Sequence, residues 1–231
     1  MPNYVDLSQP YFVGLPQGAV TSPFRLTTRN NVQLPRAELA PPCAVQISEI
    51  ALPVHCGTHV DAPSHFLPGG PDIDEIPLAT VIGQAVIADI ACEPLQEITA
   101  SDIERAGVHP SPGGMVLIRT GWGALFSVEA RSRYFDDHPF FAADVADWLI
   151  ERSVSVFGVD VASPDVPALA RQPGFTFPIH TMLLPRGILI IENLNLEPLA
   201  KLEVGGSINV FAAPLAIRGS DGAPARVVGW M

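Results

Sequence analysis

Hydrophobic and β-branched residues gather in seven short runs along the chain, and turn residues separate these runs. Runs of this length and composition predict β-strands. The run at 155–160 is almost free of polar residues, which is typical of a strand buried on both faces. The seven predicted strands are Val45–Leu52, Val81–Ile90, Met115–Thr120, Ser155–Asp160, Ile188–Glu192, Ile208–Ala213 and Arg226–Trp230.

Two segments between these runs have helical periodicity instead. A start signal at Thr99-Ala-Ser-Asp predicts a helix over Asp102–Ala106, which Gly107 closes. The segment Phe141–Arg152 alternates apolar and acidic positions as an amphipathic helix does, and the predicted strand at 155–160 follows it directly. A helix that leads into a buried strand indicates a mixed α/β fold.

Residues 1–40 are rich in Pro, Asn and Thr and have little periodicity. We expect this segment to form an arm that packs over another part of the molecule or over a neighbouring one. The remaining chain contains no internal repeat and no abrupt change of composition, so residues 1–231 are predicted to form one domain.

Composition and charge exclude several classes of protein. Hydrophobic residues make up 48% and charged residues 16%, which indicates a globular chain with a substantial core. The net charge of −11 disfavours binding to nucleic acid. No apolar run is long enough for a membrane helix, and residues 1–10 lack the pattern of a secretion signal, so we expect a cytoplasmic protein.

Cysteine and proline usage adds two constraints. Cys43, Cys56 and Cys92 are odd in number and show no CxxC spacing, so we expect small buried residues rather than disulfides or a cysteine–zinc site. Proline occurs 24 times in 231 residues, which is incompatible with a mostly helical protein.

Three of the six histidines fall within eleven residues, and an aspartate lies among them. Imidazole and carboxylate groups are the usual ligands of zinc, manganese and iron in mixed nitrogen and oxygen sites. Glycine and proline in this segment disfavour a helix. In an extended segment, alternate residues share a side, so His55, His59 and Asp61 would converge while Gly57 leaves room between them. The spacing predicts a metal site.

His65 follows Asp61 by four residues, after a bend at Pro63. The bend would carry its ring off the line of the ligands and place it above the metal. We therefore expect His65 to act as a general acid and base, with a further ligand role as the alternative.

The second half of the chain offers two more groups for such a site. Glu192 ends a strongly apolar strand, where a buried carboxylate needs a partner, and His180 follows Phe177-Pro-Ile. From the residues alone, metal ligation is no better supported than a strand-end glutamate in water and a histidine on a surface loop. His109 and His138 lie in turn-like sequence and are expected to be solvated.

The chain resembles the metal-dependent cyclase family, which includes bacterial-type kynurenine formamidases and isatin hydrolases. The central motif is His55-x-Gly57-Thr58-His59-x-Asp61-x-Pro63-x-His65-Phe66. The resemblance continues at Asp6-Leu-Ser-x-Pro10, Arg119-Thr-Gly-Trp122, Gly158-Val-Asp160-x-x-Ser163-x-Asp165, His180 through Gly187 to Glu192, Pro214-Leu-x-Ile217 and Pro224-x-Arg226.

The resemblance implies a single-domain swivelling β/β/α fold with a mixed sheet core, assembled as a dimer or tetramer, and an N-terminal segment that contributes to the pocket. It implies that His55, His59 and Asp61 bind one divalent ion and that Asp61 bridges to a second ion held with His180 and Glu192. His65 corresponds to the proton donor and acceptor. Isatin hydrolases resemble this pattern with a single manganese, so zinc or manganese and one or two ions stay open.

On the substrate side, the resemblance points to five positions. Counting back from the Pro23-Phe24 pair, the pocket tryptophan of the formamidases falls on Gly18, which weakens the case for N-formylkynurenine as the substrate. Phe24 is expected in the same pocket. Thr58, Ser163 and Asp165 are candidates for hydrogen bonds to substrate or to the ligands, although serine and aspartate here are equally suited to turns.

The expected function is hydrolysis of a small-molecule amide, formamide, or cyclic amide or ester by a metal-bound hydroxide, with His65 moving the proton. An arylformamidase would place the protein in tryptophan catabolism. One alternative is a natural-product or polyketide cyclase in which the metal stabilises an enolate. Another is a non-catalytic protein that binds a small molecule through its metal. The sequence has no GxSxG motif of a serine hydrolase and no glycine-rich phosphate loop.

Overall fold

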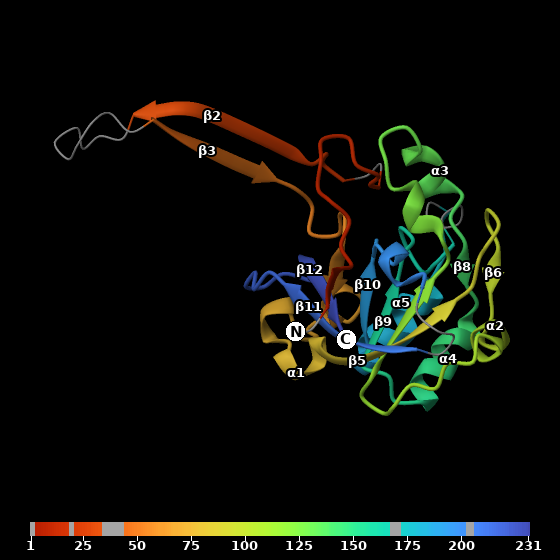
Figure 1. Cartoon of the computed structure of the whole chain (residues 1–231). Helices are drawn as coiled ribbons and strands as arrows, with labels where there is room; N and C mark the ends of the chain where they lie inside the picture. The colour runs from red at the N-terminus through yellow and green to blue at the C-terminus, as the bar shows by residue number, and fades with distance from the viewer. Residues whose placement is uncertain (1–2, 19–20, 34–43, 167–171, 202–205) are drawn as a thin grey trace.

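The computed structural model describes residues 3–18, 21–33, 44–166, 172–201 and 206–231. Its centre is a sheet that closes on itself (Figure 1). Strand β4 pairs with both β10 and β12, and this double pairing closes the ring. Around the ring lie β12 (Gly222–Trp230), β11 (Ser207–Pro214), β5 (Ile82–Asp89), β7 (Met115–Arg119), β9 (Val156–Val159), β10 (Leu189–Glu192) and β4 (His59–Asp61), and β1 (Tyr4–Asp6) extends it beside β12.

The closed sheet is mixed. Strands β5, β7, β9 and β10 run parallel, and the remaining pairs around the ring are antiparallel. Six of the seven predicted strands lie in this ring, and their observed ends differ from the predicted ones by a few residues. All four residues of β9 are buried, as its uninterrupted apolar run predicted. The predicted α/β fold with a mixed sheet core is confirmed.

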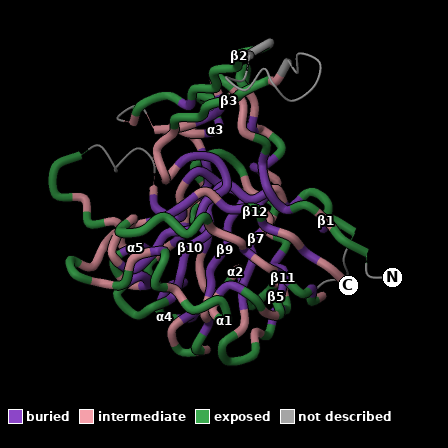
Figure 2. The backbone as a smooth tube through the Cα atoms, turned by 90° about the vertical axis from the view of Figure 1, so that its left-hand side faces the viewer, coloured by how far each residue is buried: buried purple, intermediate pink, exposed green. Residues whose placement is uncertain are grey.

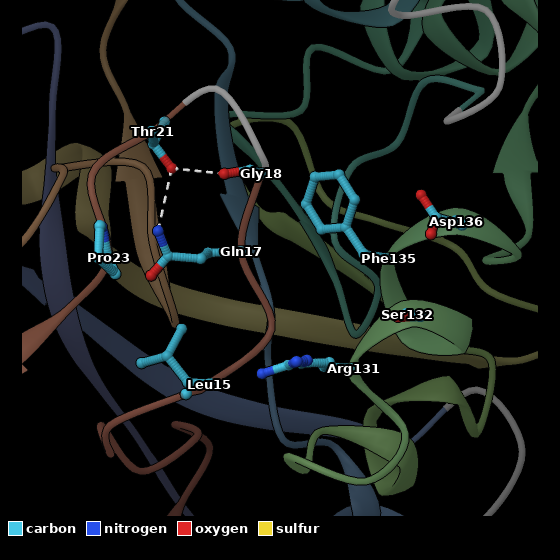
Figure 3. Close-up of a pocket in the computed structure, with 10 residues that line it drawn as sticks. Leu15, Gln17, Gly18, Thr21, Pro23, Arg131, Ser132, Phe135 and Asp136 are labelled. Atoms are coloured by element: carbon cyan, nitrogen blue, oxygen red, sulfur yellow. Dashed lines mark hydrogen bonds between the residues drawn. The ribbon is translucent and has the colours of Figure 1, made fainter.

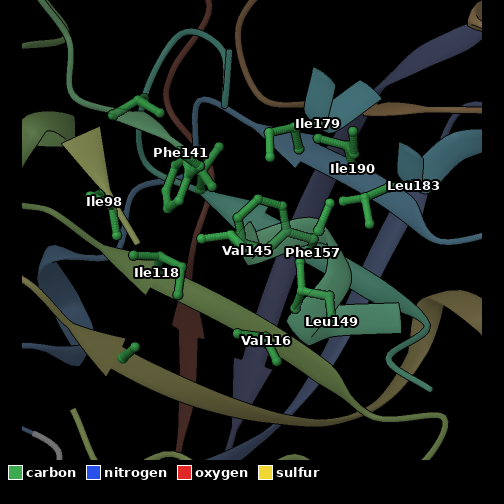
Figure 4. Packing of buried hydrophobic residues seen from close by; sticks show 14 of the residues in the cluster. Ile98, Val116, Ile118, Phe141, Val145, Leu149, Phe157, Ile179, Leu183 and Ile190 are labelled. Carbon is green, nitrogen blue, oxygen red and sulfur yellow. The ribbon is translucent and has the colours of Figure 1, made fainter. Parts of the chain in front are cut away.

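Successive side chains of each strand point to opposite faces of the sheet, so the buried hydrophobic residues form two clusters. Met115 and Leu117 point into the ring, whereas Val116 and Ile118 of the same strand point outward. The outer side chains pack against α4 (Ala143–Glu151) and α5 (Pro178–Leu183), where Leu149 and Leu183 are fully buried (Figure 4). The sheet therefore has an inner face that fills the ring and an outer face that carries helices.

The predicted helices are present. Helix α2 (Ala100–Arg105) begins at Thr99, whose hydroxyl accepts from the amide of Asp102 in a capping box, and α4 matches the predicted amphipathic helix. The sequence did not predict α5, α1 (Leu78–Val81) or α3 (Arg131–Asp136). It also missed the short strands β6 (Glu97–Ile98) and β8 (Phe140–Phe141) and the 3-10 turns Pro63–His65, Ile73–Glu75, Trp122–Leu125, Leu184–Arg186 and Glu197–Leu199. Among the described helices, none is long and apolar enough to cross a membrane.

A two-stranded hairpin projects from this body (Figure 1). Strands β2 (Arg25–Gln33) and β3 (Ala44–Ala51) pair only with each other, and their described side chains are mostly exposed (Figure 2). The predicted strand at 45–52 is therefore β3 of this hairpin, outside the main sheet. The predicted arm, residues 1–40, contains β1 and β2, and its residues 1–2, 19–20 and 34–40 lie outside the described residues. Cys43 also lies outside them. Cys56 is buried and Cys92 is partly buried.

Candidate metal centre

Strand register places three of the predicted ligands on one face of the sheet. Val60 points into the ring, so its neighbours His59 and Asp61 point to the outer face. The antiparallel pairing of β4 with β10 sets Glu192 directly opposite His59. The predicted extended conformation holds only for 59–61, because Gly57 has a φ of +61° and turns the chain before the strand. His55 approaches from this preceding loop.

Helix α5 brings His180 over the same face. The carboxylate of Asp165 accepts from the amides of Ile179 (3.0 Å) and His180 (3.3 Å) at the start of the helix, and from Nδ1 of the His180 ring (2.6 Å). This bond directs the other ring nitrogen, Nε2, toward Asp61 Oδ2 (3.5 Å) and Glu192 Oε1 (3.3 Å). Asp165 therefore orients a predicted ligand through its far nitrogen, as carboxylates do for metal-binding histidines.

The five predicted ligands form two groups that share Asp61. One group is His55, His59 and Asp61, and the other is Asp61, His180 and Glu192. Within each group the potential ligand atoms all lie within 4.8 Å of one another. His55 Nδ1 lies 2.6 Å from Asp61 Oδ1, and His59 Nε2 lies 3.3 Å from the same oxygen. The structure thus brings all five side chains together.

Two buried atoms without a hydrogen-bond partner test whether this cluster suits a metal ion. His59 donates from Nδ1 to the carbonyl of Gly57 (2.8 Å), which leaves a lone pair on Nε2. Among the described residues, neither His59 Nε2 nor Asp61 Oδ2 has a hydrogen-bond partner, although both are buried. Leaving such a group unsatisfied costs about 1–3 kcal/mol, and more for a charged one. A divalent cation would satisfy both atoms, so the donor set fits zinc or manganese.

The electrostatics of the cluster also favour a cation. Burial opposes ionisation of Asp61, but the neighbouring His55 and His59 hold the pKa of its carboxyl well below the usual value. Burial also opposes the charged form of His55, which would lower its pKa, but Asp61 and Asp221 raise this pKa to about 9. The pKa of His180 is also raised, because Asp165, Asp61 and Glu192 outweigh its burial. Without metal, protons on the histidines offset the carboxylates, and a divalent ion would take over that role.

His65 lies at the edge of the cluster, at the end of the 3-10 turn Pro63–His65. Its ring stacks on that of His55 with centroids 3.9 Å apart, and its Nδ1 lies 2.8 Å from Asp221 Oδ2. Burial lowers the pKa of His65 despite the opposing attraction of Asp61. A neutral imidazole at this position can accept a proton, as the predicted role requires.

Sequence reasoning missed Asp221 and the aromatic residues beside His180. Asp221 precedes a glycine, and this pair indicates no more than a turn. The rings of Phe66 and Phe177 have centroids 4.8 Å and 6.2 Å from that of His180, and Phe175 extends this wall. Phe66 belongs to the central motif, so its place there was the available signal.

Two predicted polar residues bond to backbone groups. The hydroxyl of Thr58 accepts from the amide of Gln9 (2.8 Å) and donates to the carbonyl of Asn193 (2.5 Å), so it ties the N-terminal segment to the end of β10. The hydroxyl of Ser163 accepts from the amide of Asp165 (3.3 Å) in a tight turn. Their roles toward a substrate remain predictions.

Gly18 and Phe24 line two different cavities. Gly18 borders a cavity of about 330 Å³ between the N-terminal loop and α3, where it faces Phe135 and where Arg131 also lies (Figure 3). Phe24 is 5% exposed and borders an apolar cavity of about 480 Å³ at the base of the hairpin, together with Leu26. Neither cavity is lined by the five predicted ligands.

The two remaining histidines differ from each other. His109 is exposed, as predicted. The prediction for His138 was wrong: its side chain is 1% exposed, and its Nδ1 donates to the carbonyl of Pro139 (2.9 Å). A turn-like sequence does not reveal that the turn packs beneath the rest of the chain.

Comparison with known proteins agrees with this geometry. The family model described as "Putative cyclase" matches residues 5–166. A kynurenine formamidase of Bordetella petrii is 35% identical over 191 residues, which cover 82% of this chain and 83% of the relative. The solved structure of isatin hydrolase A from Ralstonia solanacearum has a TM-score of 0.80 at 25% identity and covers 100% of this chain and 92% of its own. A structure described as a predicted metal-dependent hydrolase from Bacillus stearothermophilus has a TM-score of 0.74 at 27% identity, with coverage of 100% and 98%.

Proposed function

The chain belongs to the cyclase family, and we propose that it is a metal-dependent hydrolase that opens an aromatic formamide or cyclic amide at the centre formed by His55, His59, Asp61, His180 and Glu192. The observation that carries the proposal is that two buried ligand atoms, His59 Nε2 and Asp61 Oδ2, have no hydrogen-bond partner among the described residues. They lie within a cluster of three histidines and two carboxylates. Kynurenine formamidases and isatin hydrolases both act on carbon–nitrogen bonds outside peptides, which supports this reaction class.

The five ligands would hold one or two divalent ions. A bound divalent ion polarises a carbonyl oxygen and supplies a nucleophile near neutral pH by lowering the pKa of water. The two ligand groups share Asp61, so this carboxylate would help to hold each ion if two are bound. The donors are nitrogen and oxygen only, so we propose zinc or manganese.

His65 is the proton carrier of the proposed reaction. Its Nδ1 donates to Asp221, so its Nε2 is the nitrogen that accepts a proton and returns it to the leaving nitrogen. The ring stacks on the predicted ligand His55, which keeps it next to the reacting groups. Since its pKa lies below the ordinary value, the base form predominates at neutral pH.

The aromatic wall supports an aromatic substrate. Phe66 and Phe177 are half-buried, and their ring centroids lie 5.6 Å apart beside His180. A planar substrate gains from edge and face contacts with such rings. We propose N-formylkynurenine, which would place the protein in tryptophan catabolism, or isatin, and we keep the cytoplasm as its predicted location.

A panel assay tests the proposal. Protein loaded with zinc or with manganese is incubated with N-formylkynurenine, isatin and a cyclic imide, and ring opening or deformylation is followed by absorbance. We expect metal-dependent turnover of one of the three compounds. A loaded protein that binds these compounds and leaves them intact would favour a binding protein over a hydrolase.

We also propose that the protein is a homodimer or homotetramer in which the hairpin β2–β3 packs on a second copy. An isolated two-stranded hairpin is marginal in water. Leu26 and Ile50 of this hairpin are 50% and 62% exposed, and they border the apolar cavity at its base. A second copy of the chain would cover these side chains.

A further inference from the structure

We infer that Asp221 is a positioning residue that fixes both the predicted ligand His55 and the proton carrier His65. This inference deepens the proposed function and rests on it. The observation is that one oxygen, Asp221 Oδ2, lies 2.9 Å from His55 Nε2 and 2.8 Å from His65 Nδ1. No other described carboxylate contacts both a predicted ligand and His65 by hydrogen bonds.

The chemistry of these contacts sets the state of both rings. A carboxylate only accepts hydrogen bonds, so His55 donates from Nε2 and His65 donates from Nδ1. His55 Nδ1 lies 2.6 Å from Asp61 Oδ1, so without metal this nitrogen also donates, and a metal ion would displace its proton. His65 Nε2 has no such contact among the described residues and is left for proton transfer. One oxygen therefore selects the ligating nitrogen of one histidine and the basic nitrogen of the other.

Asp221 is a common anchor for the two stacked rings, and His55 has a second anchor in Asp61. They stack with centroids 3.9 Å apart and planes inclined by 26°. Each imidazole keeps rotational freedom about its side-chain bonds unless a second contact fixes it. Because both bonds end on the same oxygen, neither ring can turn without breaking its bond to Asp221.

The backbone around Asp221 is fixed relative to the ligands. The carbonyl of Asp221 accepts from the amide of Ala62 (2.9 Å), which directly follows β4. The next residue, Gly222, pairs with Asp61 across β12 and β4. The carbonyl of Ser220, the residue before Asp221, accepts from the amide of Ile73 (2.9 Å). The carboxylate is thus carried by the same sheet that carries the ligands.

Gly222 supplies the space that this arrangement needs. A Cβ atom at this position would lie 2.7 Å from His55 Cε1 and 2.8 Å from the carbonyl oxygen of Val60. Real Cβ atoms essentially never approach other atoms this closely, so any side chain here would displace His55. Asp221 and Gly222 act as a unit, because one holds the His55 ring and the other makes room for it.

The histidine tautomers provide the most specific test. Metal-free protein labelled with 15N-histidine is studied by NMR at mildly alkaline pH, and the His65 signals are assigned by their loss in His65→Gln. We expect the Nδ1–H form of His65 in the wild type and a shift to the Nε2–H form in Asp221→Ala. The matched control is Asp74→Asn, because the Asp74 carboxylate accepts from Gly219 of the same turn (3.0 Å) and bonds to no described histidine.

Metal affinity and kinetics give two further readouts. Competition with a chromophoric chelator should show about 10–100-fold weaker binding of zinc to metal-free Asp221→Ala, and an intermediate loss in Asp221→Asn, which keeps one acceptor oxygen. With an active substrate, kcat should fall while KM stays within about twofold. Asp74→Asn should match the wild type in each measurement.

An unchanged His65 tautomer together with unchanged zinc affinity in Asp221→Ala would overturn the inference. If Asp221→Ala does not fold, Gly222→Ala is used instead, because its added Cβ would displace the His55 ring. We expect this variant to remain folded by circular dichroism and to bind zinc more weakly. Unchanged zinc affinity in folded Gly222→Ala would equally overturn the inference. A wild type that turns over none of the three compounds would contradict the proposed function alone, because the tautomer and the chelator experiments require no substrate.

Discussion

At the scale of single residues, the centre depends on which nitrogen of each histidine is free. His59 donates from Nδ1 to a backbone carbonyl, and His180 donates from Nδ1 to Asp165. Both rings therefore direct Nε2 toward the carboxylates of Asp61 and Glu192. Lone pairs that face carboxylate oxygens repel them unless a proton or a metal ion lies between. The hydrogen bonds at Nδ1 of both rings thus favour a cation between their Nε2 atoms and the carboxylates.

Replacing His65 tests the separation of ligation from proton transfer. We expect His65→Ala to keep its metal and to lose about 10²–10⁴ in kcat, because its ring moves the proton and is not one of the five predicted ligands. The measurement is turnover together with metal content by mass spectrometry, with the exposed His109→Ala as control. Unchanged turnover would assign the proton transfer to another group, whereas loss of the metal would make His65 a ligand.

His138 predicts how stability depends on pH. Burial lowers the pKa of this histidine to about 4, from an ordinary value of 6.5. The folded protein holds the ring neutral, so its contribution is complete above pH 6.5 and is lost as the pH falls from 6.5 toward 4. We expect metal-free wild type to lose about 2 kcal/mol more than His138→Gln between pH 7 and pH 5. Parallel urea titrations at both pH values measure this difference, and equal losses would contradict it.

Only part of the site could be predicted from single residues. His55, His59, Asp61 and His65 cluster in the sequence, so their spacing alone pointed to a metal site. Asp221 lies 156 residues after His65, and no local pattern links the two. His138 shows the opposite failure, since burial depends on what packs over a turn rather than on the residues within it.

At the scale of elements, the six ring strands that were predicted carry buried apolar residues, and these runs made them predictable. Strand β4 has only three residues, and it was recognised by its ligands rather than by periodicity. Helix α5 begins after Phe177, which has a φ of +48°, and its first amides bond to Asp165, which precedes Ile179 by 14 residues. Such a start signal lies outside the helix itself, so sequence reading missed the element.

Gly158 in β9 tests how tightly the ring is filled. An added Cβ would lie 2.5 Å from Leu117 Cδ2 and 2.8 Å from Leu194 Cδ1. We expect Gly158→Ala to lower the free energy of unfolding by about 1–3 kcal/mol through overpacking. The matched control is Gly83→Ala in β5, where the nearest atom is Met115 Cε at 3.7 Å.

The control should change stability by no more than about 1 kcal/mol, and in the stabilising direction, because alanine is favoured over glycine within a strand. Both variants are compared by urea denaturation. If Gly158→Ala were as stable as Gly83→Ala, the interior of the ring would be looser than the structure indicates.

At the scale of the whole molecule, the exposed hairpin implies an assembly. Light scattering of the 24.6 kDa chain should give two or four times that mass. The double variant Leu26→Lys, Ile50→Lys should shift the protein toward the monomer, because charged side chains oppose burial of the hairpin. Leu78→Lys in α1 is the control, since Leu78 is at least as exposed, at 66%, but lies outside the hairpin.

A wild type that remains monomeric at high concentration would contradict the proposed assembly. A variant that stays oligomeric would place the interface elsewhere on the molecule. In both cases the metal centre is unaffected, because its five predicted ligands lie on the body of the chain rather than on β2 or β3.

Metal content tests the central claim most directly. Protein purified without added metal is analysed by inductively coupled plasma mass spectrometry, beside the double variant His55→Ala, Asp61→Ala. We predict one or two divalent ions per chain in the wild type and their near-complete loss in the variant, because Asp61 belongs to both ligand groups. A wild type that holds no metal, and takes up none when zinc or manganese is added, would contradict the account.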